Sequence, residues 1–468
     1  MPIVIRQAPI KPPTPNIMPN MPPPNIMPNM PIMPIMPIMP IMPIAYYAYY
    51  AHRLLCPLSP ISPIKPIPMP NNPITTLPLD RLALHLAANH VPNAAHILQQ
   101  EEGRRRMATK VPLWAQTPGI EYPPRLALEQ CSGQPAAQYK ASLVEQLLPL
   151  PAQRQHLVDL TGGLGVDFSF MAPLFAQATY VEQQPQLCQL AAHNMPLLAL
   201  PHAHIVNADA TQHLTQLAPD SASLIFIDPA RRSATGRKTV LIEDCQPDII
   251  TLAPSMLKAA PVVVVKLSTM LDIAAAVRAL GCVSQVHIVA TAGECKDLLL
   301  VITRQAKAQG GTNPLITAAS LLPDGTIGGS LTFTPQTEAE ATPPIAAQPL
   351  RYIYEPGPAI MKAGAFKTTA LHYQLQKLHT NTHLYTASHL VPDFQGRTFM
   401  LKATYTFGKA QLKALRSVTT QANLTVRNFP ASVDSLRKRL KLRDGGPYYI
   451  FATTLADGTH ALLLCERA

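Results

Sequence analysis

Short apolar runs alternate with amphipathic segments along the middle of the chain. Stretches with apolar positions at helical spacing, for example 184–199 and 269–280, separate these runs. Strands that alternate with helices are typical of α/β folds. We therefore expect a doubly wound, Rossmann-like α/β sheet over residues 151–345, with a return strand pair in 304–345. The apolar runs that predict strands are 156–160, 178–182, 203–207, 223–228, 261–267, 284–290 and 298–303.

The regions on either side of this sheet have other patterns. Residues 75–150 predict an N-terminal helical segment, and residues 346–395 predict a compact unit with one clear helix within 363–378. Residues 396–468 predict a small α+β module. Its elements, in chain order, are strand 398–405, helix 409–417, strand 422–428, helix 432–442 and strands 447–454 and 460–466.

The first 80 residues have the composition of a low-complexity tract. They contain 23 of the 51 prolines and 10 of the 17 methionines, and residues 18–44 repeat Met-Pro-Ile or a close variant of it. A proline at every third position excludes an α-helix and favours polyproline II. We expect residues 1–74 to be disordered, as a simple-sequence tract rather than as a proline-rich ligand for a partner domain.

Composition narrows the class of protein further. The 468-residue chain has a net charge of +11, which favours a polyanionic partner. Its seven cysteines contain no C-x-x-C pair and its 15 histidines have no metal-ligand spacing, so we expect neither a disulfide scaffold nor a metal site. There is no apolar run of about 18 residues and no secretory signal. We expect a soluble cytoplasmic protein with no membrane partner, and the sequence leaves the oligomeric state open.

The first predicted strand leads into a glycine-rich turn between Asp159 and Asp167. Its three glycines let the backbone turn tightly and approach a ligand before a helix begins. The spacing differs from the G-x-G-x-x-G pattern of dinucleotide-binding proteins, and a carboxylate before the glycines suits the cationic amino end of S-adenosylmethionine, whereas it would repel a pyrophosphate. The candidate cofactor-binding residues here are Asp159, Thr161, Gly162, Gly163, Gly165 and Asp167.

The next two strands also end in acidic side chains. Glu182 follows the glycines by about 20 residues, where a carboxylate can bind both ribose hydroxyls. Asp209 follows the third strand and is placed to reach an adenine amine. Ligands of open α/β sheets bind at the carboxyl ends of the strands, so the three strand ends together predict an S-adenosylmethionine site.

The fourth strand runs into Asp228, Pro229, Ala230, Arg231 and Arg232. This sequence resembles the substrate-facing motif of class I methyltransferases, which in amine-methylating members is Asp or Asn, then two prolines and an aromatic residue. There the acidic or amide oxygen and a backbone carbonyl accept hydrogen bonds from an exocyclic amine and orient it. Asp228 and Pro229 fit these catalytic roles. Arg231 replaces the aromatic residue, and arginine can stack on a base or bind phosphate, so Arg231 and Arg232 are candidate substrate-binding residues.

Longer blocks extend this similarity from about residue 75 to the end of the chain. Together they resemble bacterial class I S-adenosylmethionine-dependent methyltransferases that carry a C-terminal THUMP-like domain. One local departure is Gly133, where we expect a second serine after Ser132. The blocks include KVPLW (110–114), LEQCSGQPAAQYK (128–140), DLTGGLGVD (159–167), YVEQ (180–183), HN (193–194), IDPARR (227–232), VKLSTMLDI (265–273), ECKDLLLVI (294–302), YIYEPGPAIMKAGAF (352–366) and LRKRLKLRDGGPYYIFATT (436–454).

The resemblance implies S-adenosylmethionine as cofactor and methylation of RNA, either ribosomal or transfer RNA. It also implies a ferredoxin-like module at 346–395 and a THUMP-like RNA-binding module at 396–468. A segment before the first strand often closes over the methionine end of the cofactor in such enzymes, which makes Tyr139 and Lys140 candidate cofactor-binding residues, with ordinary helix surface as the alternative. Lys266, after the fifth strand, is expected at the substrate edge of the site.

Basic residues gather in the last module. Arg437, Lys438 and Arg439 lie on one predicted helix. Contacts between such side chains and RNA phosphates give salt-sensitive affinity that does not depend on base sequence. We expect these three residues to bind RNA, and a solvated helix face is the alternative.

Two other functions remain open from the sequence. Asp-Pro-x-Arg also resembles the motif of RNA uridine carbon-5 methyltransferases, whose chemistry needs a cysteine nucleophile. The stretch after the fifth strand, 266–270, has no cysteine, and Cys295 is the nearest alternative. The chain could also bind cofactor and RNA without turnover, as a cofactor-sensing assembly protein.

Overall fold

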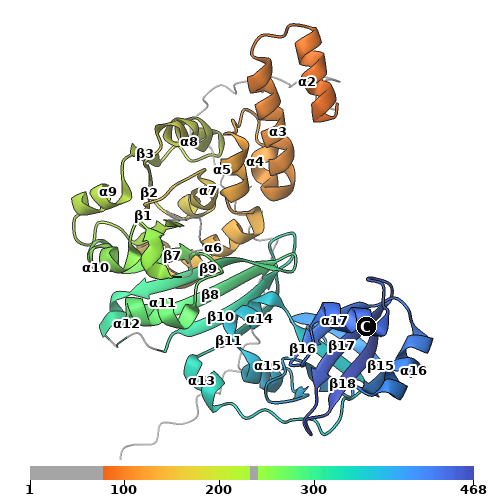
Figure 1. Ribbon diagram of the computed structural model, residues 1–468. Coiled ribbons are helices and arrows are strands. Elements are labelled where there is room, and N and C mark those ends of the chain that lie inside the picture. Colours follow the sequence, from red (N-terminus) through yellow and green to blue (C-terminus); the bar gives the residue numbers. More distant parts are fainter. Residues whose placement is uncertain (1–76, 232–240, 309, 311–312) are drawn as a thin grey trace, which may run out of the picture. The chain divides into compact units, whose positions relative to one another are not determined.

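A computed structural model describes residues 77–231, 241–308, 310 and 313–468 (Figure 1). The proline-rich tract predicted at 1–74 lies outside the described residues. Arg232 also lies outside them, and only the backbone of Arg231 is described. Within the described ranges, no helix is both long enough and apolar enough to cross a membrane.

The N-terminal helical segment is present and packs against the helix that follows the glycine-rich turn. Trp114 is fully buried, and its Nε1 donates to Ser169 Oγ at 3.1 Å. Met107 and Val111 share the same apolar cluster with Phe170. The helices are α2 (Leu79–Ala88), α3 (Ala94–Lys110), α4 (Pro112–Gln116), α5 (Arg125–Gln130) and α6 (Gln134–Leu147), packed on α7 (Val166–Met171).

All seven strands predicted for the central domain are present in one nine-stranded sheet. The strand order is β11-β10-β8-β9-β7-β4-β1-β2-β3, and β9 runs antiparallel between β7 and β8. The predicted return strand pair is β10 and β11, which extends the sheet beyond β8. The strands are β1 (His156–Asp159), β2 (Gln177–Glu182), β3 (Ala203–Asn207), β4 (Leu224–Ile227), β7 (Val262–Leu267), β8 (Val283–Thr291), β9 (Glu294–Thr303), β10 (Leu315–Leu321) and β11 (Ile327–Phe333).

Helices cover both faces of this sheet, which explains why its strands are almost continuously apolar. In β4, Ile225 and Ile227 pack into the core on one face, and Leu224 and Phe226 pack into the core on the other. The second core includes residues of α6, α7 and α8 (Pro185–Leu197). The first core includes residues of α9 (Ala210–Gln216), α10 (Ile249–Ala259), α11 (Ile273–Leu280) and α14 (Pro358–Ala363). The further helices are α12 (Arg304–Ala308) and α13 (Pro335–Glu340), and two short strands, β5 (Ala230–Arg231) and β6 (Cys245–Gln246), pair with each other.

The two C-terminal modules share one seven-stranded sheet, in the order β13-β14-β12-β15-β18-β17-β16. Pairing of β12 with β15 joins them. The strands are β12 (Tyr352–Pro356), β13 (Gln376–Lys377), β14 (Tyr385–Ala387), β15 (Gly396–Thr406), β16 (Asn423–Arg427), β17 (Tyr448–Thr454) and β18 (His460–Arg467), and the helices are α14 (Pro358–Ala363), α15 (Phe366–His372), α16 (Lys409–Val418) and α17 (Val433–Leu440).

Within 363–378 the structure has one helix, α15, as predicted, but it spans only the seven residues Phe366–His372. Helix α14 ends at Gly364, whose φ is +74°, and α15 begins two residues later. Gln374 also has a positive φ of 52°, and the chain continues as strand β13. Two left-handed residues therefore break a stretch whose side chains alone have a helical pattern.

Candidate functional site

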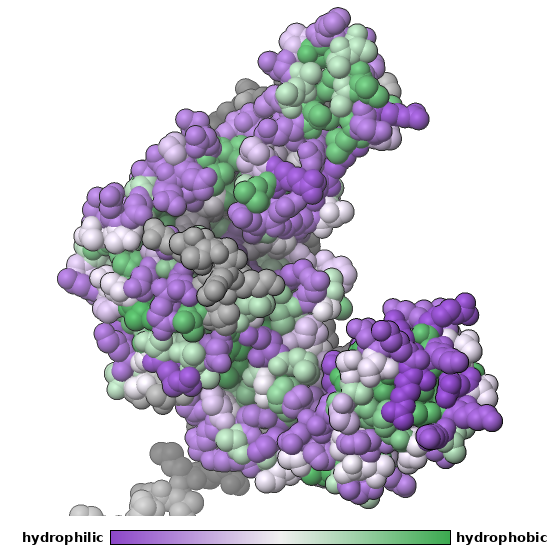
Figure 2. Space-filling model, in the orientation of Figure 1, coloured by the Kyte–Doolittle hydropathy of each residue, from purple (hydrophilic) through white to green (hydrophobic). Residues whose placement is uncertain are grey.

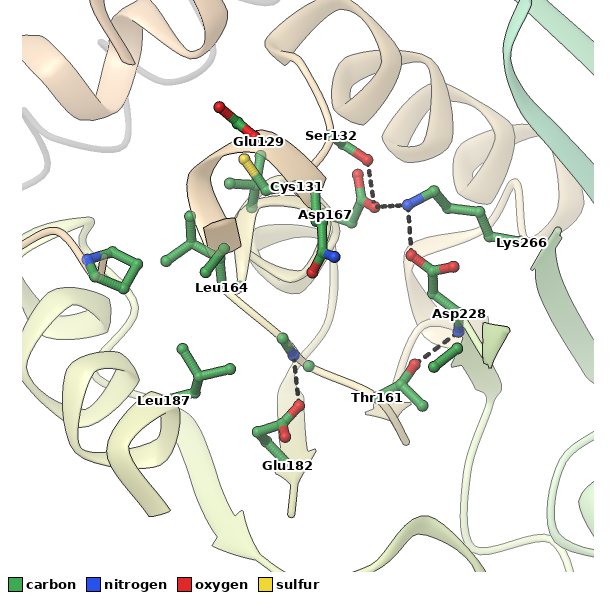
Figure 3. Close-up of a pocket in the computed structure, with 18 of the residues that line it drawn as sticks. Glu129, Cys131, Ser132, Thr161, Leu164, Asp167, Glu182, Leu187, Asp228 and Lys266 are labelled. Carbon is green, nitrogen blue, oxygen red and sulfur yellow. Dashed lines mark hydrogen bonds and ion pairs between the residues drawn. The ribbon is translucent and has the colours of Figure 1, made fainter. Parts of the chain in front are cut away.

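A cavity of about 1890 Å³ lies at the carboxyl ends of β1, β2, β4 and β7. A pocket for one small ligand usually measures about 300–1,000 Å³, so this cavity has room for a cofactor and part of a second molecule. Residues of α3, α5 and α8 form its outer walls. The predicted site residues that line it are Asp159, Thr161, Gly162, Gly163, Gly165, Asp167, Glu182, Asp209, Asp228, Pro229 and Lys266. Figure 3 labels Thr161, Asp167, Glu182, Asp228 and Lys266.

The main chain of the glycine-rich turn, with Gly162, Gly163 and Gly165, forms part of the cavity wall. Gly163 and Gly165 have φ values of +56° and +87°, which side-chain-bearing residues rarely adopt, and Gly165 caps α7. Gly162 lies against Tyr180, and its N–H donates to Val181 O at 2.8 Å. Glycine is therefore needed at 163 and 165 for the backbone conformation, and at 162 for the close approach of Tyr180.

We expect Gly162→Ala to lower the free energy of unfolding by about 1–3 kcal/mol, the usual cost of overpacking a core. The added carbon would lie 2.1 Å from Cε2 of Tyr180, whose ring is fully buried. Urea denaturation measures the loss. Gly408→Ala is the matched control, because its φ is −114° and no atom beyond its chain neighbours lies within 4 Å of the added carbon. Equal losses in the two variants would contradict this reading of Gly162.

Glu182 and Asp209 are both fixed by backbone N–H groups at the cavity. The Oε2 of Glu182 accepts from Gly163 N at 3.0 Å, and its Oε1 accepts from Gln184 N at 2.9 Å. Asp209 caps α9, since its Oδ1 accepts from the N–H groups of Thr211 and Gln212 at 2.8 and 3.1 Å. Each carboxylate therefore has a fixed position at the end of its strand.

Asp159 is the most deeply buried carboxylate of the cavity, with 1% of its surface exposed. Its Oδ1 accepts from Thr161 N at 3.0 Å, and Thr161 Oγ1 accepts from Asp228 N at 2.6 Å, which ties the ends of β1 and β4 together. No lysine, arginine or histidine among the described residues forms an ion pair with Asp159. Burial, and to a smaller extent the nearby carboxylates, raises its pKa well above the usual value.

Five charged side chains from five elements meet beside the glycine-rich turn, and we call them the charged cluster: Lys140, Asp167, Asp228, Lys266 and Asp297. Figure 3 shows Lys266 between Asp167 and Asp228. Its Nζ lies 2.5 Å from Asp228 Oδ2 and 3.6 Å from Asp167 Oδ2. Lys140 Nζ lies 3.0 Å from Asp167 Oδ1 and 2.5 Å from Asp297 Oδ2. The cluster therefore forms a continuous chain of ion pairs from β9, through α6, α7 and β7, to the end of β4.

The charged cluster shifts the pKa values of its members in different directions. Burial alone would raise the pKa of Asp167, but Lys140 and Lys266 hold it below the usual value. Partial burial raises the pKa of Asp228, and Lys266 opposes that shift without cancelling it. Burial works against the charged form of Lys266, yet the neighbouring carboxylates raise its pKa, so it remains an ammonium.

Tyr139 and Lys140 differ from the other predicted cofactor-binding residues because, in the described part of the chain, neither lines the cavity. Helix α6 directs both side chains inward, where they are 7% and 1% exposed. The Tyr139 hydroxyl is 2.9 Å from His287 Nδ1, and Lys140 belongs to the charged cluster. The alternative of ordinary helix surface is wrong for both residues, since they are buried behind the cavity.

Comparisons with known proteins agree with this architecture. A family model described as a ferredoxin-like domain matches residues 352–394, and one described as THUMP domain-like matches 396–467. An uncharacterized S-adenosylmethionine-dependent methyltransferase is similar to the chain in two Mycobacterium tuberculosis strains, with 24% identity over 71% of this chain and 84% of the relative.

A solved structure decides the family. The crystal structure of a protein assigned as a methyltransferase from Porphyromonas gingivalis W83 is 35% identical, with a TM-score of 0.71, and the match covers 84% of this chain and 95% of that one. The chain belongs to the S-adenosylmethionine-dependent methyltransferases. Its sheet is thus the class I methyltransferase sheet, and the fold class predicted from the sequence is confirmed.

The cavity of this methyltransferase fits S-adenosylmethionine. Asp159 is a buried carboxylate without a cationic partner among the described residues, as expected where a ligand ammonium completes the pairing. Glu182 has its oxygens at the end of β2, within the same cavity, where ribose hydroxyls could bind them. The glycines at 162–165 leave room for the ligand to lie against the main chain.

The basic residues of the THUMP-like domain have unequal surroundings. Lys438 and Arg439 are exposed on α17, and the guanidinium of Arg439 lies 4.3 Å from the ring centre of Phe407. Arg437 is less accessible and pairs with Asp444 at 2.8 Å. Lys438 and Arg439 are therefore better placed than Arg437 to meet a polyanion.

Sequence reasoning missed two residues of the site, Ser132 and Asp297. Both lie within blocks that carry the family resemblance, but neither drew attention as a site residue. The sequence does contain a signal for Asp297, because this carboxylate directly precedes a run of apolar residues. In the structure it lies in β9 and is only 3% exposed. Such a residue needs a buried cation, and Lys140 supplies it.

Proposed function

We propose that this methyltransferase methylates an exocyclic amino group of a base in RNA, either ribosomal or transfer RNA. The observation that carries the proposal is the position of Asp228. Its side chain is 38% exposed at the cavity, and Lys266 pairs with Oδ2, whereas Oδ1 has no hydrogen-bond partner among the described residues. One carboxylate oxygen is therefore fixed by protein, and the other is available to an amine.

The protein groups at the end of β4 would orient and polarise that amine. S-adenosylmethionine, when bound, would supply a methyl group on a positively charged sulfur; transfer would break the sulfur–methyl bond, release S-adenosylhomocysteine and free one proton from the methylated nitrogen. Asp228 Oδ1 and the carbonyl of Pro229 accept hydrogen bonds from the amino group, which directs its lone pair toward the methyl carbon. Thr161 holds the Asp228 backbone and Lys266 holds its side chain, so the acceptor is in place before the substrate arrives.

RNA is proposed as the substrate because of the C-terminal domain. Residues 396–467 match a THUMP domain-like family, and the net charge of the chain is +11. Figure 2 shows hydrophilic residues gathered over the C-terminal domain around α16 and α17. Exposed basic residues on these two helices include Lys409, Lys413, Lys438 and Arg439. Such a surface is complementary to backbone phosphates.

Reversing two of these charges tests that surface. We expect Lys438→Glu/Arg439→Glu to weaken binding of total transfer RNA and to reduce the slope of log affinity against log salt by about one for each phosphate that the variant no longer binds. Filter binding over a salt series measures both quantities. The matched control is Lys258→Glu/Arg278→Glu, which makes the same charge change at exposed residues near the ends of α10 and α11. A slope as steep as that of the control variant would remove α17 from the RNA interface.

The structure provides no support for pyrimidine carbon-5 methylation through Cys295. Among the described residues Cys295 does not line the cavity, and burial raises the pKa of its thiol, which disfavours the nucleophilic thiolate. We expect Cys295→Ser to retain wild-type transfer. A loss of activity without a loss of stability would instead support carbon-5 methylation through Cys295.

The proposed function is tested by incubating the full chain with methyl-labelled S-adenosylmethionine and total RNA from cells that lack the protein. Label that becomes soluble after ribonuclease treatment supports an RNA methyltransferase. Label that resists ribonuclease indicates a protein or small-molecule substrate. Binding of cofactor and RNA without release of S-adenosylhomocysteine would indicate the non-catalytic alternative.

A further inference from the structure

Lys140 is one of the most completely buried side chains of the protein, with 1% of its surface exposed. Its ammonium lies near four acceptors, namely Ser132 Oγ at 3.2 Å, Ala136 O at 3.3 Å, Asp167 Oδ1 at 3.0 Å and Asp297 Oδ2 at 2.5 Å. A buried ammonium is tolerated only where carboxylates and hydrogen bonds replace its lost hydration. Lys140 has both, although it does not itself reach the cavity in the described part of the chain.

All four acceptors of Lys140 belong to residues that line the cavity, and two of these residues, Ser132 and Asp167, are also bonded to each other. Ser132 precedes α6, and Asp167 is in the first turn of α7, directly after the glycine-rich turn. Ser132 Oγ also donates to Asp167 Oδ2 at 2.7 Å. One ammonium therefore joins two cavity walls that come from segments 35 residues apart in the chain.

Hydrogen bonds and ion pairs connect these two walls to Asp159. Lys266 links Asp167 to Asp228, with its Nζ 3.6 Å from Asp167 Oδ2 and 2.5 Å from Asp228 Oδ2. The N–H of Asp228 donates to Thr161 Oγ1, and the N–H of Thr161 donates to Asp159 Oδ1. Without Lys140, the carboxylates of Asp167 and Asp297 would repel each other, and Asp167 would keep only Lys266 and the Ser132 hydroxyl as partners.

We propose that Lys140 is a positioning residue for the amino-acid end of S-adenosylmethionine, and that it acts by holding Ser132 and Asp167 against each other at the wall of the cavity. The proposal rests on the cofactor of the enzyme and not on the nature of its substrate. A residue that does not touch the cofactor can still control its affinity by fixing the residues that do. This matters because a small displacement of the binding residues weakens binding strongly. A buried ion pair with a merely structural role would affect folding and leave the cofactor affinity of the folded protein unchanged.

Calorimetric titration of the full chain with S-adenosylmethionine separates these roles. We expect Lys140→Met to weaken cofactor affinity by about tenfold or more, because the loop at Ser132 and the first turn of α7 lose their common partner. The matched control is Lys377→Met. Lys377 is another buried lysine, 4% exposed, and its Nζ donates to Thr380 O at 2.7 Å within the C-terminal sheet. Wild-type affinity in a folded Lys140→Met protein would overturn the proposal.

The double variant Lys140→Met/Asp297→Asn covers the case in which the single variant does not fold. Neutralising both partners avoids an unpaired buried carboxylate, so the double variant is expected to be more stable than Lys140→Met. It still lacks the ammonium that joins Ser132 and Asp167, and we expect its cofactor affinity to stay at least about tenfold below wild type. Recovery of affinity together with stability would show that Lys140 is only structural.

Discussion

Asp228→Ala is expected to abolish methyl transfer and to leave the affinity for S-adenosylmethionine within about tenfold of wild type. Removing one preorganised electrostatic interaction with a reacting group typically costs about 10²- to 10³-fold in rate. Asp228 is 38% exposed at the cavity, and its Oδ1 has no hydrogen-bond partner among the described residues, so its removal affects the substrate side most. Transfer of label to total RNA measures the rate, and calorimetric titration measures cofactor affinity.

Asp228→Asn is the control for this prediction. Asparagine retains an oxygen acceptor for an amine but gives up the ion pair with Lys266. Its rate should therefore lie between those of the wild type and the alanine variant. A large loss of cofactor affinity in Asp228→Ala would place this residue on the cofactor side, and an unchanged rate would remove it from catalysis.

Asp159→Asn is expected to weaken S-adenosylmethionine binding by about 10- to 100-fold, because a hydrogen bond or ion pair to a charged group contributes about 1.5–3 kcal/mol. The asparagine oxygen can still accept from Thr161 N, so the turn itself should persist. The cofactor-free variant should be more stable than the wild type at neutral pH, because the buried carboxylate no longer has to be ionised.

The stability gain of Asp159→Asn over the wild type should grow as the pH rises. Burial raises the pKa of Asp159, so the folded protein binds this proton more tightly than the unfolded chain does. The contribution of this proton to the free energy of unfolding of the wild type is fully present below the pKa that Asp159 has in the unfolded chain. It is lost as the pH rises through the higher pKa that Asp159 has in the folded protein. Urea denaturation from mildly acidic to neutral pH should therefore show the two proteins diverging toward neutral pH. A variant that is less stable throughout and binds cofactor normally would contradict the assignment of Asp159.

The central sheet could be predicted from the sequence because its strands are buried on both faces. In β4, four consecutive apolar residues fill two cores, as expected for a strand that is covered by helices on both faces. Strand ends then locate the site, since Asp159, Glu182 and Asp228 each directly follow or end such a run. The cavity brings together the residues that these strand ends predicted.

Features that depend on long-range contacts could not be predicted in the same way. Lys140 and Asp297 are 157 residues apart, and a helical pattern cannot show which face of α6 is buried against β9. Pairing of β12 with β15, which joins the two C-terminal modules into one sheet, depends equally on tertiary contacts. The break between α14 and α15 depends on the left-handed conformation of Gly364, which the residue type permits but does not require.

Nucleoside analysis of RNA methylated by the full chain tests the proposed reaction most directly. RNA labelled with S-adenosylmethionine would be digested to nucleosides and separated, with Asp228→Ala treated in parallel. The result we predict is label in a nucleoside methylated on an exocyclic nitrogen, and none with the variant. Label on a ring carbon, or label that survives in Asp228→Ala, would contradict the proposed reaction.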